Sequence, residues 1–549
     1  MRWRGDKAAG STAHVLGSPY SNGPANADLV SGTGGHTRWG LILPSGPFVL
    51  SFFEAHMKRL LLITSICLFS PAATAAQDAT PTLKSLKLAG MFQNHMVLQR
   101  ERDAAILGTA KPGQTVVVTP SWALRTYEAV ADPKGRWRTT IRTPAAGGPF
   151  DITVKSGSET RKLTDVLVGE VWICSGQSNM QWKLRGFGVD HFKEDVQKAK
   201  YPRIRFCDVP QVIALEGQDD VNARWTVCSP KSALAFSAVG YFFGSRLHQE
   251  LDVPIGLIST NWGGSSAEAW VSPEVLKKQF PEFDKQYTAN EKIAAEKGVL
   301  FDRRNKAPKG LNQRNPSVLY NSMIRPVIPF SFRGVVWYQG ESNVRQPKQY
   351  RTLFPSLIRD WRSRWGQGDF PFYFVQIAPF AYKREPVSAA FLREAQAMAL
   401  AEPNTGMVVT MDIGNPDNIH PKQKKPVGER LALLALKHDY GRKDVVTSGP
   451  MYVHHKVESG TIRLSFKDIG GGLASRDGKP LSHFTIAGGD KAFVEATATI
   501  DGDTIVVSSD EVKEPVAVRF AWGSGDTPNL SNKDGLPASS FRTDDWPIK

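Results

Sequence analysis

Apolar residues in the middle of the chain, between residues 168 and 440, follow two different patterns. Almost continuously apolar runs are typical of strands buried on both faces of a parallel sheet, and apolar residues at every third or fourth position are typical of amphipathic helices. The clearest helix is predicted over residues 349–365, and another is expected from about 426 to 441. Strands are predicted at 169–174, 253–260, 334–338, 370–377 and 407–412. This alternation predicts an α/β domain with a parallel sheet.

On either side of this domain the apolar runs are short and are separated by turn signals. Gly with Pro or Asp stands between them, as at 111–113 and 501–502, which is typical of small antiparallel β domains. Short strands are predicted at 115–119, 137–142, 150–154, 452–457, 462–466, 493–500, 505–508 and 517–522. We therefore expect two β-sandwich-like domains to flank the α/β domain.

The predicted domain boundaries follow these changes of pattern. An N-terminal β domain is expected over residues 77–167, the α/β domain over 168–442 and a C-terminal β domain over 443–549. Residues from about 281 to 315 are rich in Lys, Glu, Asn and Gly, and we interpret them as an insertion lying over one edge of the functional site.

Three aromatic residues of the first β domain have two possible uses. They can form the core of the domain, which is the usual role, or they can stack on sugar rings. The residues are Trp122, Trp137 and Phe150.

The beginning of the chain resembles an export signal placed internally. Met57 is followed by two basic residues, a short apolar stretch and small residues suited to cleavage near Ala75 or Ala76. This pattern predicts a signal peptide over residues 57–76, with translation starting at Met57 and residues 1–56 as an upstream extension. The apolar stretch is short for a membrane span, and a retained N-terminal anchor is the alternative.

The charge balance is basic without long basic runs. The formal net charge is +15, and residues 1–76 contribute +3 of it, so the mature chain carries +12. The one local group is Lys422, Lys424 and Lys425, and we interpret the charge as a solvated surface with some affinity for acidic glycans. Secretion and the lack of a recognisable nucleic-acid module argue against nucleic acid as a partner.

The cysteines and histidines do not predict a metal site. Cys67 lies in the predicted signal peptide, which leaves Cys174, Cys207 and Cys228 in the mature chain. Cys207 and Cys228 could pair in an oxidising compartment, whereas Cys174 lies in an apolar strand and is expected to be a buried thiol.

Polar motifs follow the predicted strands of the α/β domain, where open α/β sheets bind their ligands. The first motif, CSGQSNMQW at 174–182, turns from the opening strand to Ser178, which could be a nucleophile or an ordinary helix-capping serine. The second, NWGGSS at 261–266, contains glycines that allow backbone amides to approach a ligand closely. The third, WYQGESN at 337–343, groups amides and a carboxylate.

The fourth motif, DNIHP at 417–421, lies after the last strand and before the last helix. Asp417 and His420 are three positions apart, so the carboxylate can hold the imidazole while the imidazole takes a proton from Ser178. Such a pair is common in sequences. Its position relative to Ser178 within one α/β domain favours the catalytic interpretation.

These four motifs, in this order, resemble the SGNH hydrolase superfamily, and the first and third resemble its sialate O-acetylesterase family. The resemblance extends to MVLQ at 96–99, Asn529-Leu530 and GLP at 535–537, so it covers nearly the whole mature chain. It implies a three-layer, flavodoxin-like hydrolase domain between the β domains. It also implies that Ser178 is the nucleophile, His420 the general base and Asp417 the orienting acid.

The resemblance further implies an oxyanion hole. Its donors would be the Ser178 N–H, a backbone N–H of the Gly263-Gly264 pair, with Gly264 as the choice, and a side chain from the third motif. That motif departs from the Gly-x-Asn-Asp of the superfamily, so Gln339 is the first choice as side-chain donor and Asn343 the second. Related carbohydrate acetylesterases also make Glu341 an alternative to Asp417.

The sequence therefore predicts a secreted or periplasmic serine esterase that removes O-acetyl groups from glycans, with acetylated sialic acids as the expected substrate. No metal or organic cofactor and no membrane span in the mature chain are expected. Acetylxylan or another polysaccharide is the alternative substrate. A non-catalytic glycan-binding protein is the alternative from a different class.

Overall fold

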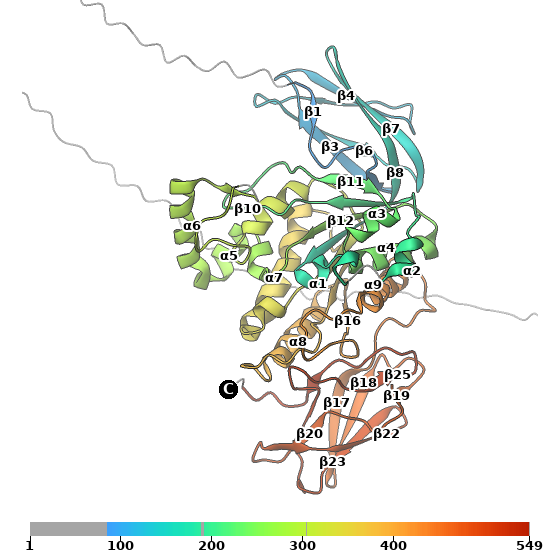
Figure 1. The fold of residues 1–549 in the computed structure, drawn as a ribbon, viewed down its shortest axis with the longest axis vertical. Helices are drawn as coiled ribbons and strands as arrows, with labels where there is room; N and C mark the ends of the chain where they lie inside the picture. The colour runs from blue at the N-terminus through green and yellow to red at the C-terminus, as the bar shows by residue number, and fades with distance from the viewer. Residues whose placement is uncertain (1–84, 188–190, 303–304, 548–549) are drawn as a thin grey trace, which may run out of the picture. The chain divides into compact units, whose positions relative to one another are not determined.

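A computed structural model describes residues 85–187, 191–302 and 305–547 (Figure 1). The predicted signal peptide and upstream extension, and Cys67 with them, lie outside these residues. Among the described residues, no helix combines the length and apolar character needed to cross a membrane.

A large sheet forms the centre of the fold, and β8 (Glu159–Gly176) runs through its middle. The strands on one side of β8 are β12 (Ile255–Asn261), β9 (Ile204–Asp208) and β11 (Arg224–Val227), in that order. Those on the other side are β14 (Gly334–Tyr338), β15 (Phe372–Val375) and β16 (Thr405–Val408). Strands predicted from continuous apolar runs thus occupy the buried middle of the sheet.

The sheet is mixed rather than purely parallel, which corrects the prediction. Neighbours from β9 to β16 pair in parallel, but β11 pairs with β9 in the antiparallel direction. An antiparallel neighbour needs no helical crossover, so the loop between these two strands is sufficient to reverse the chain. Neither β9 nor β11 was among the strands predicted from the sequence.

Helices cover both faces of this sheet, and the alternation along β8 shows why its sequence is continuously apolar. Trp172 and Cys174 pack in one core cluster, with side chains of α4 (Ala238–Leu251) and α9 (Lys424–His438). Val171 and Ile173 pack in the other, with α7 (Pro347–Trp365) and α8 (Ser388–Met398). Because successive side chains point to opposite faces, both faces must be apolar.

The predicted helices agree with the structure to within a few residues. The helix predicted over 349–365 is α7, and the one predicted near 426–441 is α9. The remaining helices of this region are α1 (Ser178–Gln181), α2 (Lys193–Gln197), α3 (Pro230–Leu234), α5 (Pro273–Gln279) and α6 (Asp284–Lys297). Two short strands, β10 (Ile213–Ala214) and β13 (Leu300–Phe301), pair with each other.

β8 also belongs to the N-terminal β region, because its first half pairs with β7 and β2. The strand therefore passes without a break through residue 167, the predicted boundary between the N-terminal β domain and the α/β domain. The other strands of this region are β1 (Lys87–Leu88), β2 (Val97–Gln99), β3 (Asp103–Thr109), β4 (Thr115–Pro120), β5 (Tyr127–Val130), β6 (Arg136–Arg142) and β7 (Gly147–Ser156). Trp137 is buried in the core, whereas Trp122 and Phe150 are half-buried and pack edge to face at 5.2 Å.

The C-terminal region forms three small antiparallel sheets. Their orders are β17-β18-β23-β22, β21-β20-β24-β26 and β19-β25. The strands are β17 (Met451–Glu458), β18 (Thr461–Lys467), β19 (Leu473–Ser475), β20 (Phe484–Ala487), β21 (Phe493–Glu495), β22 (Thr497–Asp501), β23 (Thr504–Ser508), β24 (Ala517–Phe520), β25 (Leu530–Asn532) and β26 (Phe541–Arg542). The buried Arg393 of α8 donates to backbone oxygens of Ala521 and Gly523, so this region is tied to the central one.

Cys174, Cys207 and Cys228 are buried free thiols. The possible pairing of Cys207 with Cys228 is absent, because the two side chains belong to different core clusters. Burial alone raises the pKa of Cys174, which agrees with its predicted role as packing behind the strand.

Candidate active site

The chain turns sharply at the end of β8 because Gly176 occupies a position that a side chain would block. Its φ is +132°, and a Cβ atom there would lie 2.2 Å from the carbonyl oxygen of Tyr338 in β14. The Gln177 N–H donates to that same oxygen at 2.9 Å, which closes the turn. Ser178 follows as the first residue of α1.

The Ser178 hydroxyl faces a histidine from the opposite end of the domain sequence. Nε2 of His420 lies 2.9 Å from Oγ of Ser178, and both side chains are half-buried. Gln177, not Ser178, is the N-cap of α1, and its side chain makes no capping bond. The alternative interpretation of Ser178 as a capping serine is therefore wrong.

The surroundings of His420 favour its neutral imidazole. Burial, and after it the nearby Lys424 ammonium, lowers the pKa of His420 below its ordinary value. The Trp182 ring lies against the imidazole, with 4.6 Å between the ring centroids, and the backbone N–H of His420 donates to Oδ1 of Asn418 at 2.9 Å. A neutral imidazole at 2.9 Å from a hydroxyl can accept its proton.

Asp417 does not contact His420 as its predicted role as orienting acid requires. Its side chain is exposed, and its backbone N–H donates to Oδ1 of Asn415 at 2.8 Å. Within residues 305–547, neither a hydrogen bond nor an ion pair joins the Asp417 carboxylate to His420. Asp417 and His420 each donate their backbone N–H to an Asn two residues earlier, so they belong to two successive turns, and a spacing of three does not by itself bring their side chains together.

The Gly263-Gly264 loop approaches Ser178 closely. A Cβ atom on Gly263 would lie 3.4 Å from Cβ of Ser178, and the Gly263 N–H donates to Oε1 of Gln181 at 2.5 Å. In the described chain, the N–H groups of Ser178 and Gly264 donate to no other residue. The segment predicted as an insertion contacts this loop, since Gln313 and Arg314 donate to the Gly263 and Gly264 oxygens at 3.1 and 2.9 Å.

Gln339 and Asn343, the predicted side-chain donors, are committed to a buried network. Gln339 is 0% exposed, donates to Oδ1 of Asn343 at 2.7 Å and accepts from the Tyr350 hydroxyl at 2.9 Å. Asn343 in turn donates to Oε2 of Glu268 at 2.9 Å and accepts from the Ala267 N–H. Gln339 is therefore not available as the predicted oxyanion donor in this structure. Its side-chain atoms instead bind Asn343 and Tyr350 and so hold the loops behind the site.

Glu341, the alternative acid, contacts Asn179 instead of the histidine. The Asn179 amide donates to Oε1 of Glu341 and to the carbonyl oxygen of Ile419, the latter at 3.1 Å, and accepts from the Lys424 ammonium. Burial raises the pKa of Glu341 and lowers that of Lys424 to about 7, against the attraction between the two groups. This buried set therefore supports the backbone next to His420.

The interpretation of the basic group at 422–425 as solvated surface is wrong for Lys424, which is 0% exposed. Asn179 and Trp182 were not predicted as site residues either, although both lie within the first motif. Their proximity to Ser178 in the sequence was the available signal. For Lys424 the signal was its place at the start of the last helix, four residues after His420.

The chain is similar to proteins of known class. Residues 307–437 match the family model described as "Carbohydrate esterase, sialic acid-specific acetylesterase". The sialate O-acetylesterase of Mus musculus is 32% identical over 409 residues, which cover 66% of this chain and 75% of that protein. That of Homo sapiens is 32% identical over 402 residues, which cover 66% and 73%.

A solved structure covers more of the chain. The crystal structure of a carbohydrate acetylesterase from Xanthomonas citri is 36% identical and has a TM-score of 0.74. The match covers 84% of this chain and 100% of that one. The resemblance read from the four motifs is thereby confirmed. The protein is a carboxylic ester hydrolase, and the chain belongs to the sialate O-acetylesterase family of carbohydrate esterases.

Proposed function

We propose that the protein hydrolyses O-acetyl esters on glycans through an acetyl-enzyme formed on Ser178. The observation that carries this proposal is the 2.9 Å separation between Ser178 Oγ and Nε2 of His420 at the carboxyl end of the central sheet. A hydroxyl so placed becomes a nucleophile when the imidazole takes its proton during attack.

In the first half-reaction, Ser178 Oγ bonds to the acetyl carbonyl carbon and its proton passes to Nε2 of His420. The N–H groups of Ser178 and Gly264 are the proposed donors to the resulting oxyanion, because neither donates to another described residue and Gly263, next to Gly264 in the chain, lies against Ser178. The tetrahedral intermediate then collapses, the bond to the sugar oxygen breaks, and that oxygen takes the proton from His420. The sugar hydroxyl is released and acetyl-Ser178 remains.

In the second half-reaction, His420 takes a proton from water as the water oxygen attacks acetyl-Ser178. The intermediate collapses with Ser178 Oγ as leaving group, the proton returns to it, and acetate is released. The buried Glu341, Asn179 and Lys424 have a positioning role in this proposal, since Asn179 binds the Ile419 oxygen immediately before His420.

The proposed substrate is an O-acetylated sialic acid. Support comes from the curated relatives, which are sialate O-acetylesterases at 32% identity. A polysaccharide such as acetylxylan is the second candidate, because the relative from Xanthomonas citri is described more broadly as a carbohydrate acetylesterase. Presenting both substrates side by side and measuring released acetate decides between them.

The catalytic proposal is tested with 4-nitrophenyl acetate. The unaltered protein is expected to hydrolyse it with an initial burst, and Ser178→Ala is expected to abolish the burst and the turnover. Mass spectrometry of a quenched reaction should find the acetyl group on the peptide that contains Ser178. Equal, slow hydrolysis by both proteins would show that the reaction does not use this serine.

We also propose the three-layer SGNH arrangement with flanking β-sandwich-like domains as the setting of this site, and export through residues 57–76. The layered core described above supports the first, and the basic, apolar and small-residue order after Met57 supports the second. Expression from Met57, followed by N-terminal sequencing of the exported protein, tests export. A mature end near Ala76 is expected, and a retained Met57 would contradict it.

A further inference from the structure

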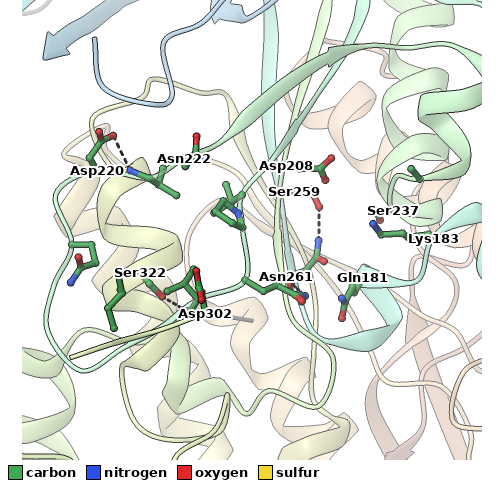
Figure 2. A pocket seen from close by; sticks show the side chains of 18 residues that line it. Gln181, Lys183, Asp208, Asp220, Asn222, Ser237, Ser259, Asn261, Asp302 and Ser322 are labelled. Atoms are coloured by element: carbon green, nitrogen blue, oxygen red, sulfur yellow. Dashed lines mark hydrogen bonds between the residues drawn. The ribbon is translucent and has the colours of Figure 1, made fainter. Parts of the chain in front are cut away.

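A cavity of about 660 Å³ opens at the carboxyl ends of β9 and β12 (Figure 2). Its walls come from the end of α1, from these two strand ends, from the loop between β9 and β11, and from Leu300 and Asp302. The volume lies within the range of about 300–1,000 Å³ that small-molecule sites occupy. The mechanism proposed above uses none of the groups that line it.

The cavity adjoins the reacting hydroxyl through two of its lining residues. Gln181 lies one helical turn after Ser178, and its Oε1 accepts from the Gly263 N–H at 2.5 Å. Gly263 itself lies against Ser178, as its close approach to Cβ of that residue shows. Asn261, another lining residue, ends β12 just before this loop. A ligand that extends from Ser178 past Gln181 therefore enters the cavity.

The lining is polar, and part of it is available to a ligand. Asn261 donates to Oγ of Ser259 at 2.9 Å, so these two groups are partly used within the wall. Asp208 is exposed, and its carboxylate makes no hydrogen bond to any described residue. Figure 2 shows Asp208, Lys183 and Gln181 around the same open space. A carboxylate, an ammonium and amides together can accept from and donate to adjacent sugar hydroxyls.

The charges favour a neutral ligand. Lys183 is the one cation among the lining residues that the structure describes, and both it and Arg224, which lies outside the lining, attract the Asp208 carboxylate. Asp220 adds another carboxylate to the wall, so an anionic ligand would meet more negative than positive groups here. Val209, Val212 and Leu300 add apolar surface, which suits the C–H faces of a sugar ring.

We propose that this cavity is a subsite for a neutral sugar unit joined to the acetylated residue that Ser178 attacks. The proposal rests on the function proposed for Ser178 and extends it. Binding energy from the neighbouring sugar would hold the ester in place, so a larger glycan should be a better substrate than the acetylated monosaccharide. Both candidate substrate classes offer a neutral neighbour, a xylose unit in acetylated xylotriose and a galactose unit in O-acetylated sialyllactose.

The test compares three substrates of increasing size with the unaltered protein, Asp208→Ala and Asn222→Trp. 4-Nitrophenyl acetate fills only the acetyl position, an acetylated monosaccharide adds one sugar, and the acetylated oligosaccharide also fills the cavity. We expect Asp208→Ala to lower kcat/KM for the oligosaccharide about tenfold, mainly through KM, because hydrogen bonds to a charged group are lost. Hydrolysis of nitrophenyl acetate should remain within about twofold of that of the unaltered protein.

Asn222→Trp tests the cavity without removing a charge. Asn222 is an exposed lining residue, so a larger side chain there narrows the space and should raise KM only for the oligosaccharide. Asp510→Ala is the matched control, because Asp510 is an exposed carboxylate on the C-terminal region and should leave all three activities unchanged.

The outcomes separate this proposal from the catalytic one. Equal losses on all three substrates in Asp208→Ala, or no loss on the oligosaccharide in either cavity variant, would overturn the subsite. An unaltered protein that gains nothing from the larger glycan would overturn it as well. The catalytic proposal has its own test: it would be overturned if Ser178→Ala still hydrolysed nitrophenyl acetate.

Discussion

The ends of β8 and β14 carry similar polar motifs, but the structure uses them differently. After β8, Ser178 is half-buried and contacts His420. After β14, Gln339, Glu341 and Asn343 are buried, and their bonds run to other loops behind the site. Polar residues at strand ends can therefore either face the reacting groups or hold the loops that present them, and only their neighbours in space distinguish the two roles.

The largest effect is expected at the β8 end. Ser178→Ala or His420→Ala should lower kcat on the order of 10⁴-fold or more, because each removes one half of the proton-transfer pair. Thermal unfolding should hardly change, since both side chains are only half-buried. If either variant kept more than about a tenth of the activity, Ser178 and His420 could not be the reacting pair.

Glu341→Gln tests whether the motif after β14 acts by holding His420 in position. We expect kcat to fall between about tenfold and a hundredfold, because a changed bond to Asn179 shifts the backbone next to His420. KM should change little, and the acid limb of the pH profile should move. A kcat loss as large as that of His420→Ala would mean that Glu341 itself is the acid of the reaction.

Gln339→Ala should act mainly on stability. It removes the side-chain acceptor of the buried Tyr350 hydroxyl and one of the two hydrogen bonds to the Asn343 oxygen, which keeps its bond from the Ala267 N–H, at a total cost of about 1–3 kcal/mol. The temperature of thermal unfolding should fall, and the kcat of the folded fraction should fall much less than in Ser178→Ala. Unchanged unfolding with a large loss of kcat would restore Gln339 as an oxyanion donor.

The pH dependence sharpens the description of the β8 end. Burial and Lys424 lower the pKa of His420, so its neutral, proton-accepting form should persist below pH 6.5. We expect kcat/KM on nitrophenyl acetate to be level across neutral pH and to fall only as the pH drops through this lowered pKa. Lys424→Met removes a nearby positive charge, so its acid limb should lie at higher pH. A limb at lower pH would contradict this electrostatic account.

The smallest effect is expected for Asp417→Asn. The carboxylate is exposed and lies outside hydrogen-bonding contact with His420, so kcat/KM should change less than about threefold. Measured beside Glu341→Gln under the same conditions, it shows which carboxylate matters. A loss exceeding that of Glu341→Gln would return Asp417 to its predicted role.

Much of the fold could be predicted because its signals are local. Continuous apolar runs predicted β14 and the middle strands, and the spacing of apolar residues predicted α7 nearly to its ends. The strands β9 and β11, at one side of the sheet, were not predicted, because pairing with a distant neighbour decides their conformation. The free state of Cys207 and Cys228 also depends on which faces of the sheet their side chains occupy.

The family, the α/β core and the pairing of Ser178 with His420 could be predicted from the sequence, because the apolar pattern, the order of the four motifs and the turn at Gly176 can be recognised along the chain. Which of the other polar groups in the four motifs lie near the hydroxyl depended on the tertiary structure. It buried Lys424 and Gln339 and left Asp417 exposed. The physical reason is that a side chain's direction depends on loops that approach from other strands, and spacing along one segment does not encode that approach.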